Sequence, residues 1–467
     1  MGDEAERRRQ LLEDPVGPTL LRLTLPMMLG IGAILFFNVV DTFWVGQLGP
    51  TELAAMGFTF PVSMIVSNLT MGISIGATAV IARAVGEGHR DRVRRLTTDS
   101  LVLSVLIVVS VSGLGLLTID PLFRALGANH ETLPPIRSYM VPWYLGIGLL
   151  VVPMVGNGAI RATGDTRMPS LVMVAAGLVN AVLDPLLIFG WGPVPALGLT
   201  GAALATVGSY GVAMALGLYL LASRGMLTLT SPAIGAVLRS WQGILRIGLP
   251  AAGTNLLTPV AGALVTRIVA GHGQHPVAAY GVGTRVEGLA MIGVFALTAA
   301  ITPFVGQNLG ANKAARIRET LRFCVKVALG WGLASAAILA ALAWPLARVF
   351  NDDPEVVAMT VAYLRTVPLS YGLFGLALLV AAMFNAMDAP LKATLIAFVR
   401  LIVLAVPLAW FGSVLFGVTG IFLGIGAANL VIGGVAWRMG RAHVGGLDPE
   451  HVRGRATSRQ PAGAAAG

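Results

Sequence analysis

Long apolar stretches are the feature that most constrains this 467-residue chain. A helix that crosses the hydrocarbon core of a bilayer needs about 20 consecutive, mostly apolar residues. Twelve such stretches can be read along the sequence. They cover residues 18–46, 53–85, 97–120, 135–160, 169–192, 197–223, 240–270, 277–308, 319–345, 355–386, 390–413 and 416–439. The sequence therefore predicts an all-α polytopic membrane protein with twelve transmembrane helices.

The composition excludes several classes of soluble protein. Hydrophobic residues make up 56% of the chain and charged residues 12%, whereas a soluble domain carries about 25% charge. Such a chain cannot cover its surface with polar groups, which excludes a soluble enzyme, a disordered regulator and a disulfide-rich secreted scaffold. The single cysteine, Cys324, gives neither an internal disulfide nor a multi-cysteine metal site.

Basic residues are unevenly divided between the loops. The net charge is +10, and most arginines and lysines fall in alternate loops, such as those around Arg92, Arg167 and Arg316. Loops rich in Lys and Arg remain on the cytoplasmic side of a membrane. We therefore expect a multi-pass protein of the cytoplasmic (inner) membrane with both termini in the cytoplasm. The excess positive charge indicates contact with anionic membrane lipid and not with nucleic acid.

An internal repeat sets the predicted architecture. A shift of 224 positions keeps one register over more than a hundred residues. It pairs residues 21–26 with 245–250, Gly86 with Gly310 and Tyr139 with Tyr363. Each half would hold six spans, and an even number gives both halves the same orientation. We expect two six-helix lobes related by a pseudo-two-fold axis along the membrane normal.

The repeat divides the chain into five predicted parts. The two lobes are flanked and joined by polar segments, and the last of these is rich in Gly, Ala and Arg, a composition typical of disorder. The parts are a cytoplasmic N-terminal segment (1–17), the N-lobe with helices 1–6 (18–223), a cytoplasmic linker (224–239), the C-lobe with helices 7–12 (240–441) and a disordered tail (442–467).

Ionisable and polar residues inside the N-lobe spans form the first candidate site. Asp41 lies in the first span, and Asn180 and Asp184 share one face of the fifth because they are four residues apart. Thr206 in the sixth span adds a hydroxyl. A charge at the centre of a membrane helix costs roughly 2.5–3.5 kcal/mol or more, so it is usually functional or paired.

Two uses of these N-lobe groups remain open from the residues alone. Two acids close together would act as a proton acceptor, or their oxygens would coordinate Na⁺. The alternative is that they only cap or cross-link helices. This alternative carries more weight for Asn180 and Thr206, because amides and hydroxyls often join membrane helices.

The C-lobe carries a different set of charges. The repeat places Val265 where the N-lobe has Asp41. A possible charge network is formed by Arg267, Arg285, Glu287 and Arg400. Glu287 is a candidate coupling acid, but the neighbouring Arg285 could equally neutralise it.

Several motifs, in order, resemble those of the multidrug and toxic compound extrusion (MATE) transporters, most nearly the DNA-damage-inducible-F branch. They are LPMMLGIGAILFFNVVDTFWVGQLG in the first span, ARAVGEG and GQNLGA at the ends of the second and eighth, RATGDTRMP after the fourth and NAVLDPLLIFG in the fifth. The resemblance covers about residues 15–440. It implies a cation-coupling role for Asp41, Asn180, Asp184 and Thr206.

The same resemblance implies the function. It is that of a secondary active multidrug efflux antiporter, which exports organic, often cationic, compounds in exchange for H⁺ or Na⁺ by alternating access. It needs no cofactor besides the coupling ion, and its partners would be small-molecule organic substrates and membrane lipid. We expect it to work as a monomer. The resemblance also suggests that Pro26 allows a bend in the first span that responds to the charge on Asp41. A proline near a first helical turn has a purely structural explanation as well.

Aromatic and methionine side chains could line an adaptable pocket for lipophilic cations. The candidates in spans 1, 2 and 4 are Met27, Phe36, Phe37, Phe60, Met64, Met140 and Trp143. Most such residues on membrane helices face lipid or pack against other helices instead.

Two other functions fit the residues less well. A flippase for a lipid-linked precursor would need cations for a pyrophosphate, which Arg267, Arg285 and Arg400 could provide, but Asp41 and Asp184 argue against it. An intramembrane enzyme or a passive channel is disfavoured by the two-lobe repeat. All six histidines fall in loops or the tail, and there is no Walker lysine motif. We therefore expect no enzyme activity and no metal site.

Overall fold

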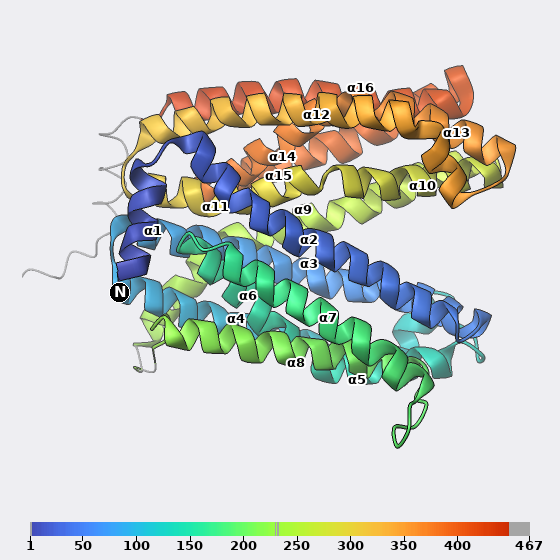
Figure 1. The fold of residues 1–467 in the computed structure, drawn as a ribbon, viewed down its shortest axis with the longest axis horizontal. Coiled ribbons are helices and arrows are strands. Elements are labelled where there is room, and N and C mark those ends of the chain that lie inside the picture. Colours follow the sequence, from blue (N-terminus) through green and yellow to red (C-terminus); the bar gives the residue numbers. More distant parts are fainter. Residues whose placement is uncertain (1, 229, 231–232, 448–467) are drawn as a thin grey trace, which may run out of the picture. The chain divides into compact units, whose positions relative to one another are not determined.

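The computed structural model describes residues 2–228, 230 and 233–447, and these are almost entirely helical (Figure 1). The first half of the sequence forms α1 (Gly2–Glu13), α2 (Val16–Gly46), α3 (Pro50–Glu87), α4 (Arg90–Ala125), α5 (Leu133–Gly146), α6 (Gly148–Ala162), α7 (Arg167–Phe189) and α8 (Leu199–Ser223). The second half forms α9 (Ile234–Ala270), α10 (Gln274–Ala290), α11 (Ile292–Gly310), α12 (Ala314–Phe350), α13 (Pro354–Thr366), the 3₁₀ segment η1 (Val367–Ser370), α14 (Tyr371–Ala386), α15 (Pro390–Phe398), the π-helical segment η2 (Val399–Ala405) and α16 (Val406–Gly445). An isolated bridge between Trp191 and Val194 closes the turn before α8.

The described helices provide twelve membrane spans. Ten helical runs are long and apolar enough to cross a membrane, and α5 and α6, bent by 48°, form an eleventh. The last run, Pro390–Gly445, has 56 residues and would be about 84 Å long if straight. Non-helical backbone at Phe416 and Gly417 divides it into two spans. The prediction of an all-α membrane protein with twelve spans is therefore confirmed.

Three predicted spans are interrupted in the structure. The span 135–160 breaks at Ile147, the span 277–308 breaks at Met291, and the span 355–386 contains η1. Pro368 lies in η1, and a proline supplies no backbone N–H to a regular helix. In addition, α16 remains helical to Gly445, past the predicted start of the tail at 442. Residues 448–467 of that predicted tail lie outside the described residues.

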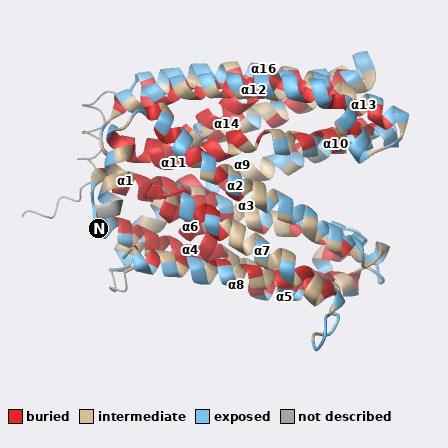
Figure 2. Cartoon of the chain, in the orientation of Figure 1, coloured by how far each residue is buried: buried red, intermediate tan, exposed pale blue. Residues whose placement is uncertain are grey.

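One compact unit contains the described residues of Met1–Arg22, Ala82–Gly88 and Leu257–Gly467. Within this unit, α14 packs against α11, α12 and α16. Figure 2 shows that α11 is mostly buried, whereas α16 exposes many side chains. Apolar exposed residues on outer helices are what a lipid-facing surface requires. Large aromatic side chains, including Tyr363, Phe304 and Phe422, fill the interior of this unit.

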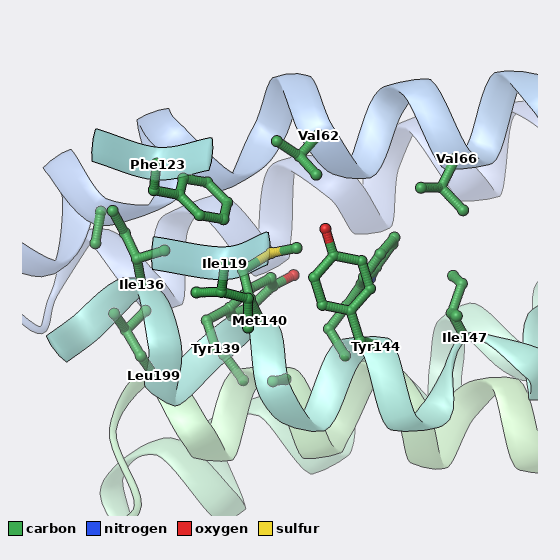
Figure 3. Close-up of a cluster of buried hydrophobic side chains, with 14 of the residues drawn as sticks. Val62, Val66, Ile119, Phe123, Ile136, Tyr139, Met140, Tyr144, Ile147 and Leu199 are labelled. Atoms are coloured by element: carbon green, nitrogen blue, oxygen red, sulfur yellow. The ribbon is translucent and has the colours of Figure 1, made fainter. Parts of the chain in front are cut away.

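The other compact unit contains Leu23–Ile81 and His89–Leu256. Its helices α5, α6 and α7 each pack against α8. A buried cluster forms around α5, where Ile136, Tyr139, Met140 and Tyr144 meet Val62 and Val66 of α3 (Figure 3). The two units differ from the halves of the repeat, because Ala82–Gly88 at the end of α3 belongs to the first unit and α9 as far as Leu256 belongs to the second. The predicted domain boundaries remain a sequence-based division.

Candidate cation site

Helix α7 places an amide and a carboxyl group one turn apart. Asn180 Nδ2 donates a hydrogen bond to Asp184 Oδ1 at 3.2 Å, as expected for residues four positions apart on one helix face. Asp184 is completely buried. The amide therefore orients one oxygen of the carboxyl group and leaves the other for a different partner.

Helix α2 brings Asp41 to the same place. The carboxyl groups of Asp41 and Asp184 are close enough to interact directly. Among the described residues, Asp41 Oδ1 and Asp184 Oδ2 are buried and accept no hydrogen bond. A buried polar atom without a partner is costly. Two such oxygens on adjacent acids form a donor set that fits a proton or a small hard cation.

The packing of α2 on α7 explains why the two acids meet. The Phe37 ring lies against Gly177, where an added Cβ would be 1.9 Å from the ring. One turn after Phe37 comes Asp41, and one turn after Gly177 comes Asn180. Further along, the Trp44 and Phe189 rings meet edge to face with centroids 6.0 Å apart. Contacts on either side of Asp41 and Asp184 thus hold the two acids beside each other.

Helices α5 and α8 complete the site with hydroxyl groups. Thr206 Oγ1 donates to the carbonyl of Ala202 at 3.0 Å, so its lone pairs remain available. Tyr139 lies near Thr206 and near both acids, and Tyr210 lies near Asp41. The structure therefore brings the four predicted residues Asp41, Asn180, Asp184 and Thr206 into one region.

Tyr139 and Tyr210 are the site residues that the sequence reasoning missed. Each stands in an apolar stretch, where an uncharged tyrosine is not conspicuous. The repeat offered one signal, because Tyr139 aligns with Tyr363 across the shift of 224 positions. Figure 3 shows Tyr139 on α5 beside Met140, within the buried cluster.

The other predicted N-lobe residues fall into two groups. Met27, Met140 and Trp143 are buried at 1%, 0% and 2% exposure, so in this conformation they pack against other helices and offer no surface to a ligand. Phe36 and Phe60 are exposed, at 63% and 65%, and Phe37 and Met64 are half-buried. Pro26 lies inside α2, which is continuous from Val16 to Gly46. The cavity and the bend remain predictions.

The C-lobe charges divide into a connected pair and an exposed pair. Glu287 accepts a hydrogen bond from the Tyr363 hydroxyl at 3.0 Å and lies within electrostatic range of Arg400. Arg267 and Arg285 are exposed, and within the described residues no ion pair joins either to Glu287. Neutralisation of Glu287 by Arg285, one of the alternatives left open by the sequence, has no direct contact behind it in the described residues.

Arg400 is held at an irregular part of its helix. It lies in η2, its guanidinium stacks over Phe374 at 4.2 Å from the ring centroid, and Nη1 donates to Asn429 Oδ1 at 3.2 Å. Asn429 in turn donates to Ser370 of η1 at 3.0 Å. Single π-helical turns often occur at functional sites. Here the turn places a cation within electrostatic range of Glu287.

Twelve spans in two sequence repeats, with a pair of acids near the ends of α2 and α7, are the arrangement of a membrane transporter and not of an enzyme. The MatE family model matches residues 26–186 and 250–411. The two matches begin 224 positions apart, in agreement with the repeat. The chain belongs to the MatE (multidrug and toxic compound extrusion) family of membrane transporters.

Relatives with known names support this membership. The chain is 40% identical to the FAD transporter of Shewanella oneidensis over 427 residues, which are 91% of this chain and 94% of that protein. It is 26% identical to a probable multidrug resistance protein NorM of Thermotoga maritima, over 73% of this chain and 74% of that protein. The crystal structure of the Vibrio cholerae MATE transporter VcmN in the bent form matches with a TM-score of 0.88 and 30% identity, covering 92% of this chain and 98% of that one. The narrower assignment to the DNA-damage-inducible-F branch remains a prediction.

Proposed function

We propose that this chain is a secondary active antiporter that exports organic compounds in exchange for H⁺ or Na⁺. Asp41 and Asp184 would bind the coupling cation, with Asn180 and Thr206 orienting the acids. The observation that carries the proposal is the pair of adjacent carboxyl groups, each with one buried oxygen that lacks a hydrogen-bond partner. A bound cation satisfies both oxygens, so occupied and empty states of the site differ in free energy.

We infer the orientation from the loop charges. Both termini would lie in the cytoplasm, in the inner membrane, so that the ends of α3 and α11 face the cytoplasm. The cation site would then lie nearer the outer side, because Asp41 is only five residues before the end of α2 at Gly46. A monomer surrounded by lipid suffices for this arrangement.

Two substrate classes are supported. Several relatives are multidrug proteins, which favours organic, often cationic, compounds. The 40% identical relative is an FAD transporter, which makes a flavin dinucleotide the second candidate. A flippase for a lipid-linked precursor has less support, because Arg400 is already engaged by Asn429 and Phe374.

Purified protein in liposomes tests the proposal. Transport of ethidium, as a lipophilic cation, and of FAD would be followed under a pH gradient and under a Na⁺ gradient imposed separately. We expect one gradient to drive accumulation of at least one substrate. Equal transport with and without both gradients would contradict the antiport proposal.

A further inference from the structure

Helix α1 precedes the first membrane span and docks on the described part of the first compact unit. It packs against α11, next to which it lies in Figure 1. Leu11 and Leu12 near its end are buried, at 1% and 7% exposure. Pro15 follows, and α2 starts at Val16. These apolar contacts attach the C-terminal end of α1 to its neighbours.

The last carbonyl groups around the end of α1 are bound by side chains of α11, of α12 and of the turn between them. Leu11 O accepts from Asn308 Nδ2 at 3.2 Å and from Arg316 Nη2 at 3.1 Å. Leu12 O accepts from Lys313 Nζ at 2.9 Å, and Asp14 O accepts from Arg316 Nη2 at 2.7 Å. Carbonyls at a helix end lack intrahelical donors, and cations there are stabilising.

Arg8, one turn earlier, binds the end of a different helix. Its Nε donates to Val85 O at 2.9 Å and its Nη2 to Gly86 O at 2.8 Å. Both carbonyls belong to the last turn of α3. Thus α1 is bonded through its end to α11 and α12, and through Arg8 to α3.

The ends of α3 and α11 also meet each other directly. A Cβ on Gly86 would lie 2.1 Å from Gln307 O, and a Cβ on Gly310 would lie 2.2 Å from Arg83 O. These residues are related by the repeat, since 310 − 86 = 224 and 307 − 83 = 224. The junction is therefore a reciprocal backbone contact between equivalent helix ends of the two sequence repeats.

We propose that α1 is a clasp that holds this junction closed. In a two-repeat transporter, alternating access moves one repeat against the other. Access from the side of this junction requires the ends of α3 and α11 to separate. Because α1 binds both ends, separation must break either the Arg8 bonds or the bonds around Asn308, Lys313 and Arg316. The clasp stabilises the closed junction relative to the open one. When the junction opens, the hydrogen bonds from Arg8 to α3 are the ones that break.

Thiol labelling of the junction tests the clasp without any transport assay. Val85→Cys in a Cys324→Ala background places one thiol in the closed junction, where Val85 is 6% exposed. Arg8→Gln and, separately, Arg316→Gln should each raise the labelling rate about tenfold, the shift that about 1.4 kcal/mol of lost hydrogen bonding gives. Arg8→Lys should restore part of the protection.

Arg9→Gln is the matched control. Arg9 is exposed and bonds Glu6 within α1 itself at 2.9 Å, so the same loss of charge on the same helix should leave labelling unchanged. The native Cys324, buried in α12, reports general loosening in chains without the Val85 change. Unchanged labelling in both the Arg8 and Arg316 variants would overturn the clasp. So would a parallel rise at Cys324, because α1 would then be a general support.

A second measurement, of the apparent KM, distinguishes a failure of the clasp from a failure of the proposed function. Only this measurement rests on the proposed function. If the open junction admits substrate, Arg8→Gln should lower the apparent KM for substrate on that side severalfold, because the competent state is more populated. A purely structural role would not lower KM. Faster labelling without any gradient-driven transport in the wild type would leave the clasp standing and contradict the antiporter.

Discussion

Tyr139 and Tyr363 occupy the same position in the two repeats, and each lies beside a carboxyl group of its own half. Tyr139 adjoins Asp41 and Asp184, whereas Tyr363 donates a hydrogen bond to Glu287. Both halves thus have the tyrosine, but the acids beside it lie on α2 and α7 in the first half and on α10 in the second. The repeats share a scaffold and differ in where they place negative charge.

Tyr363→Phe tests whether the Glu287 network is structural. The change removes a hydrogen bond to a carboxyl group from a side chain that is 1% exposed. We expect the free energy of unfolding to fall by about 1–3 kcal/mol, seen as a lower melting temperature, with gradient-driven transport retained in the folded protein. Loss of transport at unchanged stability would instead place Glu287 in the coupling mechanism.

Two glycines at the kink of α16 should not tolerate a side chain. A Cβ on Gly412 would lie 2.0 Å from Gly420 O, and one on Gly420 would lie 1.9 Å from Gly412 O. We expect Gly420→Ala to lower stability by about 1–3 kcal/mol through overpacking. Gly434→Ala is the control, because a Cβ there meets nothing within 4 Å. Equal melting temperatures for the two variants would refute the close contact.

Asp353 should make the N-terminal end of α13 sensitive to acid. Its Oδ1 accepts from the backbone N–H groups of Glu355 at 2.8 Å and Val356 at 3.3 Å. These bonds, with a smaller effect of His275, hold the pKa of Asp353 below its ordinary value of 3.8. The folded state therefore binds this proton less readily than the unfolded state, so the stabilisation is complete above that value and is lost as the pH falls through the lower folded pKa.

Asp353→Asn separates the charge from the helix cap. Asn can accept the same two backbone bonds, so the variant should keep most of the stability at pH 7 and lose the acid dependence from this site. Asp353→Ala should lose both. Melting curves between pH 2.5 and pH 7 give the comparison, and an unaltered acid dependence in Asp353→Asn would contradict the assignment.

The orientation can be checked with two single cysteines in a Cys324→Ala background. Gln47 and Arg90 are both exposed and stand at opposite ends of α3. In intact cells, an impermeant thiol reagent should label Gln47→Cys and not Arg90→Cys, because loops rich in Lys and Arg remain on the cytoplasmic side of a membrane. Labelling in the reverse pattern would invert the topology.

The spans, and the grouping of polar residues in the candidate N-lobe site, could be predicted because both depend on composition and spacing. Apolar length defines a membrane helix, and the four-residue spacing of Asn180 and Asp184 places them on one face. The approach of Asp41 to Asp184 required the packing of Phe37 on Gly177, which no local pattern in either span indicates. The resemblance to a known family supplied that pairing.

The contacts of α1 could not be predicted from residue types. Arg8 and Arg316 bind backbone carbonyls, and every residue has a carbonyl, so no partner residue stands out in the sequence. The breaks at Ile147 and Met291 are likewise set by packing within apolar runs. For the same reason the sequence suggested Arg285 as a partner of Glu287, when the adjacent helix supplied Tyr363 instead.

Gradient-driven export by Asp41→Asn is the most direct test of the proposed antiport. The substitution preserves the shape of the side chain and removes the charge that binds the cation. Proteoliposomes containing the wild type or Asp41→Asn would be compared under whichever gradient drives the wild type, with melting temperature as the check on folding. A folded variant without gradient-driven export is the expected result. Export at the wild-type rate by Asp41→Asn would contradict the assignment of Asp41 and Asp184 as the coupling site.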